Sequence, residues 1–291
     1  MSKNAKGFFL GILGVFFYSL MLVLMKLAQS VSPEIIAFSR IIGLALFTLP
    51  FVIKTPALLK TSRMDLHLVR VLCFFIGNFC VWYSLSRIYL VNISLLVSAT
   101  PLMVPLLTFL FFKKTIGKLK LITIMIGFIG TALIINPQME PLKLAHLLAF
   151  ILPVTAAVSI LSINKLSEKD NTITILFYYS VLSSLLSFLV MVPRFHAIDP
   201  VMWFYLGAIA ISSTLFQLFT TKAYAIGNPQ DVSPVIYFDV IFCSLFGWGI
   251  WGENLTPVIF FGSFMIILAG LYIIFENRLE PFFSKRKDLS S

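Results

Sequence analysis

The sequence has little charge. Asp, Glu, Lys and Arg together make up 12% of its 291 residues, while apolar residues make up 59%. Soluble globular chains carry about a quarter charged residues and roughly 45–50% apolar ones. This composition excludes intrinsic disorder and argues against an ordinary soluble enzyme. Such a composition is typical of a protein embedded in a lipid bilayer.

Cysteine and histidine are also scarce, with three of each. Cys73, Cys80 and Cys243 all fall inside apolar stretches, where a thiol behaves as a small hydrophobic group. Three scattered thiols exclude a disulfide framework, and neither a metal nor another cofactor is predicted. An enzyme embedded in the membrane would need clustered catalytic groups. No acidic pair lies near a nucleophile, so catalysis is the weaker class of function.

The sequence does contain long apolar blocks. Val104–Phe112 and Leu121–Ile135 are uncharged, and Val235–Trp251 carries only Asp239. A helix needs about 20 mostly apolar residues to cross about 30 Å of hydrocarbon. The blocks therefore predict an all-α membrane protein with ten transmembrane helices, the first of them a span rather than a cleaved signal. The expected spans are 7–28, 34–54, 68–89, 92–113, 119–136, 144–165, 172–193, 202–225, 230–251 and 257–276.

The net charge of +10 lies mostly in the short gaps between these spans, which does not indicate nucleic-acid binding. If the N-terminus is inside, 17 of the 22 Lys and Arg residues fall on the inner side and five on the outer side. Positively charged loops stay in the cytoplasm. We therefore expect a multi-pass protein of a bacterial inner membrane with both termini cytoplasmic, and an even number of spans agrees with this.

A weak internal repeat appears when the sequence is shifted by 139 residues. Lys26 then falls on Lys165, and Asn78 falls on Gln217. The expected units are 7–137 and 144–276, each with five spans, followed by a polar cytoplasmic tail at 277–291. An odd number of spans places the second unit upside down relative to the first. Inverted repeats are typical of alternating-access transporters, although a duplication without mechanistic consequence is the alternative.

Several motifs resemble one known family. The stretches that carry the resemblance are Phe38-Ser39-Arg40, Ala99-Thr100-Pro101, Gly127-Phe128-Ile129-Gly130, Lys222-Ala223-Tyr224 and Gly247–Leu255 with Glu253. They look like the motifs of ten-helix, EamA-type members of the drug/metabolite transporter superfamily. The resemblance covers nearly the whole chain, but Lys113-Lys114 stands where many relatives carry Glu. It implies the two-repeat fold and a transport activity.

A narrower resemblance links the chain to S-adenosylmethionine carriers of intracellular bacteria. Leu59–Arg63, Phe177–Ser180 and Tyr237-Phe238-Asp239 are similar to stretches of that subgroup. It implies a cationic or zwitterionic substrate. Tyr179 becomes an aromatic candidate for the binding site through this resemblance. Tyr237 lies near the centre of its expected span and could contact an organic cation through its ring, although most aromatics of such a chain face lipid.

Asp239 is the strongest candidate for a substrate-binding residue, because it lies near the middle of its expected span. A carboxylate there must meet water, a cation or a hydrogen-bond donor. It could bind an ammonium or sulfonium group or a coupling proton, or it could be a structural carboxylate paired with another helix. Asn78 and Gln217 occupy equivalent positions in the two repeats and could line the same cavity. Hydrogen bonding between helices is the alternative for both amides.

Two further candidates accompany them. Trp82 lies one helical turn from Asn78 on the same face, and it could contact an organic cation through its ring. Arg40 could contact a substrate carboxylate, or its side chain could reach outward to the interface. Pro101, Pro105 and Pro234 predict bends in the fourth and ninth spans, suited to gates or to ordinary kinks.

These features predict a secondary transporter that moves a small polar metabolite through the bilayer by alternating access, with one half tilting against the other. An S-adenosylmethionine uptake carrier or exchanger is the more specific alternative, and a membrane-embedded enzyme is the alternative from another class. A channel would show pore-lining charge or a filter-like loop, and neither is visible. The expected partners are the substrate and lipid, with a monomer and a homodimer both open.

Overall fold

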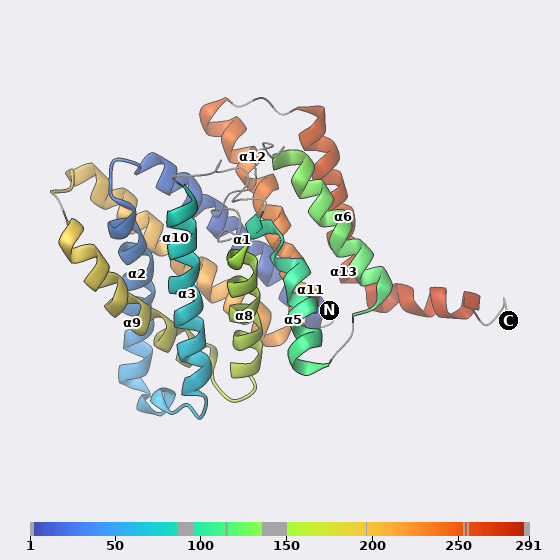
Figure 1. Ribbon diagram of the computed structural model, residues 1–291, viewed down its shortest axis with the longest axis horizontal. Coiled ribbons are helices and arrows are strands. Elements are labelled where there is room, and N and C mark those ends of the chain that lie inside the picture. Colours follow the sequence, from blue (N-terminus) through green and yellow to red (C-terminus); the bar gives the residue numbers. More distant parts are fainter. Residues whose placement is uncertain are drawn as a thin grey trace.

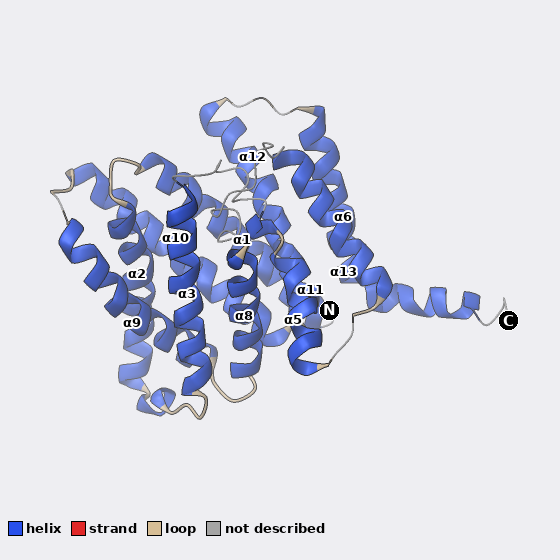
Figure 2. Cartoon of the chain, in the orientation of Figure 1, coloured by secondary structure: helices blue, strands red, loops and turns tan. Residues whose placement is uncertain are grey.

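The computed structural model describes residues 3–85, 96–113, 116–135, 150–195, 197–252, 254 and 256–287; the side chains of Asn78, Phe79, 81–85 and 274–287 are outside this description. Every element in these ranges is a helix, joined by short loops (Figure 2). Their bounds are α1 (Lys3–Leu27), α2 (Pro33–Lys54), η1 (Pro56–Leu59), α3 (Met64–Leu85), α5 (Thr100–Phe112), α6 (Lys118–Ile135), α8 (Ile151–Leu166), α9 (Thr172–Met191), η2 (Val192–Arg194), α10 (Pro200–Ile226), α11 (Pro229–Val232), η3 (Ser233–Tyr237), α12 (Phe238–Trp251) and α13 (Pro257–Lys287).

The helices have the lengths and composition of membrane spans. Six helical stretches are long and apolar enough to cross a bilayer, and three shorter apolar helices accompany them. The six are Lys3–Leu27, Pro33–Lys54, Lys118–Ile135, Thr172–Arg194, Pro200–Ile226 and Pro229–Trp251. The chain is therefore a multi-pass membrane protein. The count of ten spans stays a prediction, because parts of the expected third, fourth and sixth spans lie outside the described residues.

Short polar residues begin several helices. The side chains of Asn171, Asp199 and Asn228 accept hydrogen bonds from the backbone N–H groups two residues later, at the starts of α9, α10 and α11. Pro200 and Pro229 follow two of these caps, where proline has no N–H to leave unpaired. Local sequence thus fixes where the second-half helices begin.

The two halves of the sequence are interleaved in space. Helix α1 packs on α10, α2 on α9 and α10, α3 on α8, and α6 on α13, so each of these pairs joins a first-half helix to a second-half helix. Figure 1 shows α6 and α13 running side by side at one edge of the bundle. Apolar faces of each half are thus buried against the other, and the expected tilting of one half against the other stays a prediction.

Glycine allows a close approach of α6 and α13. A Cβ atom on Gly130 of α6 would lie 2.8 Å from the carbonyl oxygen of Gly262 in α13, and a Cβ on Gly262 would lie 2.6 Å from the carbonyl oxygen of Gly130. Small residues let membrane helices approach until their backbones touch. The α6–α13 contact therefore depends on the absence of side chains at both positions.

The ninth expected span is not one continuous helix. It consists of α11, the 3₁₀ turn η3 and α12, and Pro234 lies in the turn. The structure describes residues 96–113 of the expected fourth span. This part is also interrupted, by a turn at Ala99 just before α5. Pro101 lies in the first turn of α5 and Pro105 inside it. The ninth span is the fourth span of the second half. Each half therefore has an interruption beside a proline in its fourth span, at Ala99 in the first half and at η3 in the second.

The chain beyond residue 276 is helical as far as Lys287. Helix α13 continues to Lys287, and its last part leads away from the bundle toward the C-terminus (Figure 1). Residues 277–287 include four Lys and Arg residues, which are good helix formers, although Pro281 also lies in this stretch.

Candidate functional site

Asp239 lies in the first turn of α12, the eleventh of the 23 residues in Pro229–Trp251. Its Oδ1 atom accepts a hydrogen bond from the Ser19 hydroxyl of α1 at 2.6 Å and a longer one from the Cys243 thiol at 3.4 Å. Ser19 is fully buried, whereas Asp239 is half-buried. Within the described ranges, Oδ2 has no hydrogen-bond partner. One carboxylate oxygen is therefore held and the other is available.

The charge of Asp239 has no basic partner within 4.0 Å among the described side chains. The other buried acids differ. Asp231 contacts Lys120 at 2.6 Å, and Asp170 contacts His67 at 2.9 Å. A carboxylate inside a membrane needs a compensating group. Two neutral donors leave the negative charge of Asp239 uncompensated, which suits a cationic ligand.

Tyr18 of α1 lies near both this carboxylate and Arg40 of α2. Tyr18 precedes Ser19 in α1, packs against Phe216 with ring centroids 4.9 Å apart, and lies within electrostatic range of both Asp239 and Arg40. Arg40 is half-buried in α2, and its Nε atom is buried without a hydrogen-bond partner. Two of the predicted binding residues, Asp239 and Arg40, are thus both near Tyr18.

Tyr179 is buried in α9 and contacts a basic residue that the sequence analysis did not select. The guanidinium carbon of Arg70 lies 4.4 Å from the centre of the Tyr179 ring. Arg70 is 1% exposed, and its Nη1 atom donates to the carbonyl oxygen of Ile175 at 3.3 Å. It had been counted with the charges of the inner loops. Its position inside the apolar run after Leu68 was the signal that could have identified it.

The remaining candidates are less informative. Gln217 is half-buried in α10, and no hydrogen bond of its side-chain amide is found among the described residues. Tyr237 is 1% exposed, donates to the carbonyl oxygen of Ile124 at 3.2 Å and packs on Gly127, so its ring is fixed against α6. The side chains of Asn78 and Trp82 lie outside the described residues, and the predicted pairing of Asn78 with Gln217 stays a prediction.

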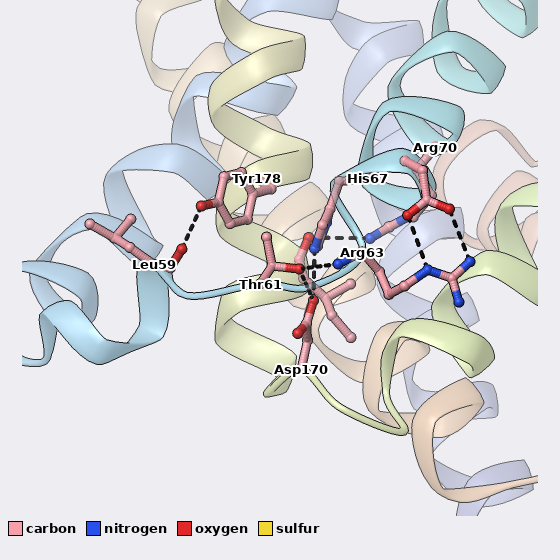
Figure 3. Close-up of polar contacts among 9 residues, drawn as sticks. Leu59, Thr61, Arg63, His67, Arg70, Asp170 and Tyr178 are labelled. Carbon is pink, nitrogen blue, oxygen red and sulfur yellow. Dashed lines mark hydrogen bonds and ion pairs between the residues drawn. The ribbon is translucent and has the colours of Figure 1, made fainter.

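A second polar cluster lies at the end of the bundle where α1 begins. Asp170, in the loop between α8 and α9, accepts from the Thr61 hydroxyl at 2.7 Å and contacts His67 Nε2 at 2.9 Å (Figure 3). We call these three residues the Asp170 clasp. Beside it, the Tyr178 hydroxyl donates to the carbonyl oxygen of Leu59 at 2.6 Å. The clasp connects the α2–α3 loop of the first half to the second half.

A third cluster lies at the same end. Asp231 of α11 contacts Lys120 of α6 at 2.6 Å and accepts from the Asn4 side chain at 2.5 Å. Next to it, a pocket of about 430 Å³ opens between the ends of α5, α8 and α10 and the start of α11, with Asn164 and Gln230 in its wall. This end of the molecule is therefore polar and partly open, whereas Met21, Ile36 and their neighbours form an apolar cluster near the opposite end of α1.

Comparison with known proteins agrees with this picture. The profile of the EamA-like transporter family matches residues 5–136 and again residues 143–275. One solved crystal structure has a TM-score of 0.80 at 12% sequence identity and covers 93% of this chain and 97% of its own, which shows a shared fold.

Several curated proteins are similar over most of their length. The pseudopaline exporter CntI of Pseudomonas aeruginosa is 26% identical over 90% of this chain and 94% of its own. The S-adenosylmethionine uptake transporter of Rickettsia bellii is 24% identical over 84% of both chains. The riboflavin transporter of Vibrio cholerae is 25% identical over 74% of this chain and 73% of its own. With nearly all of its length matched in two stretches, the chain belongs to the EamA-like transporter family.

Proposed function

We propose that this protein is a secondary transporter that carries a small polar metabolite across a bacterial inner membrane by alternating access, with Asp239 as the substrate anchor. The uncompensated charge of Asp239 halfway along its span carries the proposal. Its Oδ1 atom is held by Ser19 while Oδ2 is available for a ligand. A cationic group on the substrate would supply the missing charge.

The proposed topology is two inverted five-helix repeats, 7–137 and 144–276, with both termini cytoplasmic. The double match to the family profile and the interruptions near Pro101 and Pro234 support it. The proposed motion tilts one half against the other, and the contacts between first-half and second-half helices are the surfaces that would move. A reporter at the C-terminus that is active only in the cytoplasm tests the orientation, and activity of a reporter specific to the outer side contradicts it.

A more specific candidate is an S-adenosylmethionine carrier or exchanger. The Rickettsia relatives that carry this name support it, and the sulfonium group of that compound is a cation of the kind that Asp239 would bind. The pseudopaline and riboflavin transporters match at similar identity, so similarity alone does not favour one substrate.

The test is uptake into proteoliposomes of a panel of cationic, zwitterionic and anionic metabolites that includes S-adenosylmethionine. We expect saturable uptake of compounds that carry a cationic group, and its loss in Asp239→Asn. Asp65→Asn is the matched control, because Asp65 is exposed and pairs with Arg63 at the edge of the protein. Uptake restricted to acidic compounds, or unchanged uptake by a well-folded Asp239→Asn variant, contradicts the role of Asp239.

A further inference from the structure

Two guanidinium groups lie around Tyr179. Arg70 of α3 lies over its ring at 4.4 Å, and Arg40 directly precedes Ile41, which packs in the same buried cluster as Tyr179. The charges of both arginines act on the Tyr179 hydroxyl. Arg40 comes from α2 and Tyr179 from α9, so three helices meet here. Leu44 and Leu176 form a buried apolar cluster with Tyr179 and limit the access of water.

Neither guanidinium has an acidic partner. Within the described part of the chain, no carboxylate lies within 4.0 Å of Arg40 or Arg70, and the Nε atom of each is buried without a hydrogen-bond partner. Arg70 is completely enclosed, and the donation from its Nη1 to Ile175 is long at 3.3 Å. Burying an ion without a counter-ion is costly, and a tyrosine ring compensates only part of that cost.

The geometry of guanidinium favours one kind of ligand. Its planar fork of N–H donors matches the two oxygens of a carboxylate, and such pairs are stronger than neutral hydrogen bonds. A single buried guanidinium could serve only to pack one helix against another. Two of them around one buried tyrosine, each with an unused donor, form a site for an anionic group.

We propose that Arg40, Arg70 and Tyr179 form a subsite that binds the carboxylate of the transported substrate. The proposal rests on the carrier function above and defines its substrate class as metabolites that bear both a cationic group and a carboxylate. The cation binds at Asp239, and Tyr18 is near both Asp239 and Arg40.

The competing explanation is that Arg70 only holds α3 against α9 through Tyr179 and Ile175. This explanation predicts that loss of the guanidinium lowers stability and affects all substrates alike. A carboxylate subsite predicts selective loss for compounds that carry the carboxylate. Matched probes that differ only in that group separate the two.

The experiment measures uptake by the full-length protein in proteoliposomes with three pairs of probes: S-adenosylmethionine and its decarboxylated form, lysine and cadaverine, and arginine and agmatine. We expect the wild type to prefer a carboxylated member over its partner by about tenfold or more. Arg40→Met and Arg70→Met should each slow uptake of the carboxylated member only. The ratio of carboxylated to decarboxylated uptake should therefore fall toward one. Arg70→Lys keeps the positive charge but lacks the planar fork of N–H donors. Its preference for the carboxylated member should therefore lie between those of the wild type and Arg70→Met.

Arg63→Met is the control, because Arg63 is only partly buried and already pairs with the exposed Asp65. If Arg70→Met does not fold, Arg40→Met and Arg70→Lys decide. Equal or better uptake of the decarboxylated members, uptake of no carboxylated probe, or an equal loss for both members of a pair overturns the subsite. If Asp239→Asn abolishes uptake while the arginine variants keep the preference, the subsite is wrong and the carrier function stands.

Discussion

Ser19 of α1 and Asp239 of α12 are joined by a hydrogen bond of 2.6 Å, although 220 residues separate them in the sequence. The Ser19 hydroxyl also lies 3.0 Å from the carbonyl oxygen of Val15 in its own helix. It has one proton to donate, and the charged carboxylate is the stronger acceptor. This bond fixes which oxygen of Asp239 faces a ligand.

Ser19→Ala should therefore weaken substrate binding. Removing a hydrogen bond to a charged group typically costs 1.5–3 kcal/mol, so we expect the apparent KM to rise by about tenfold or more. Ser19→Thr should keep most of the affinity. Thr48→Val is a matched control, because the Thr48 hydroxyl is buried and bonds only within α2. A KM that is the same in Ser19→Ala and wild type would show that this bond does not support the site.

Cys243 can report on the occupancy of the site, because its thiol lies 3.4 Å from Asp239 Oδ1. In a Cys73→Ser, Cys80→Ser background, we expect a small methanethiosulfonate reagent to label Cys243 and the transported substrate to slow that labelling. Mass spectrometry of the intact protein measures it. Labelling that is indifferent to substrate would place the binding site away from Asp239.

The Asp170 clasp should contribute to stability. In Asp170→Ala, His67 and Thr61 lose their shared acceptor while His67 stays fully buried. Leaving buried polar groups unpaired costs about 1–3 kcal/mol, so we expect a fall of several degrees in the apparent melting temperature in detergent. Asp65→Ala breaks an exposed pair in the same region and should change it little. Equal melting temperatures for the two variants would contradict the clasp.

Gly262→Leu should separate α6 from α13. Even a Cβ atom at this position would lie 2.6 Å from the carbonyl oxygen of Gly130, and the larger side chain has no space. We expect a clear loss of thermal stability. Gly207→Leu in α10 is the control, because nothing lies within 4 Å of a Cβ there. Similar melting temperatures for both variants would indicate that the close approach is unnecessary.

The sequence predicted the positions of the helices better than the contacts between them. The span expected at 34–54 corresponds to α2, and the expected bend at Pro234 corresponds to η3. Periodicity and prolines act locally, so both can be read from neighbouring residues. Ser19 and Arg70 were not selected, since their roles depend on residues that are distant in the sequence. Nothing in the sequence indicated that Ser19 faces Asp239 or that Arg70 lies over Tyr179.

The pairing of α1 with α10 has a consequence for biosynthesis. Helix α10 is completed about 200 residues after α1. At roughly 5–20 residues per second, the ribosome needs about 10–40 s to make that stretch. During this interval α1 has entered the bilayer with the polar Ser19 side chain facing lipid or the insertion machinery. The earliest helix of the chain is thus among the last to reach its final neighbours.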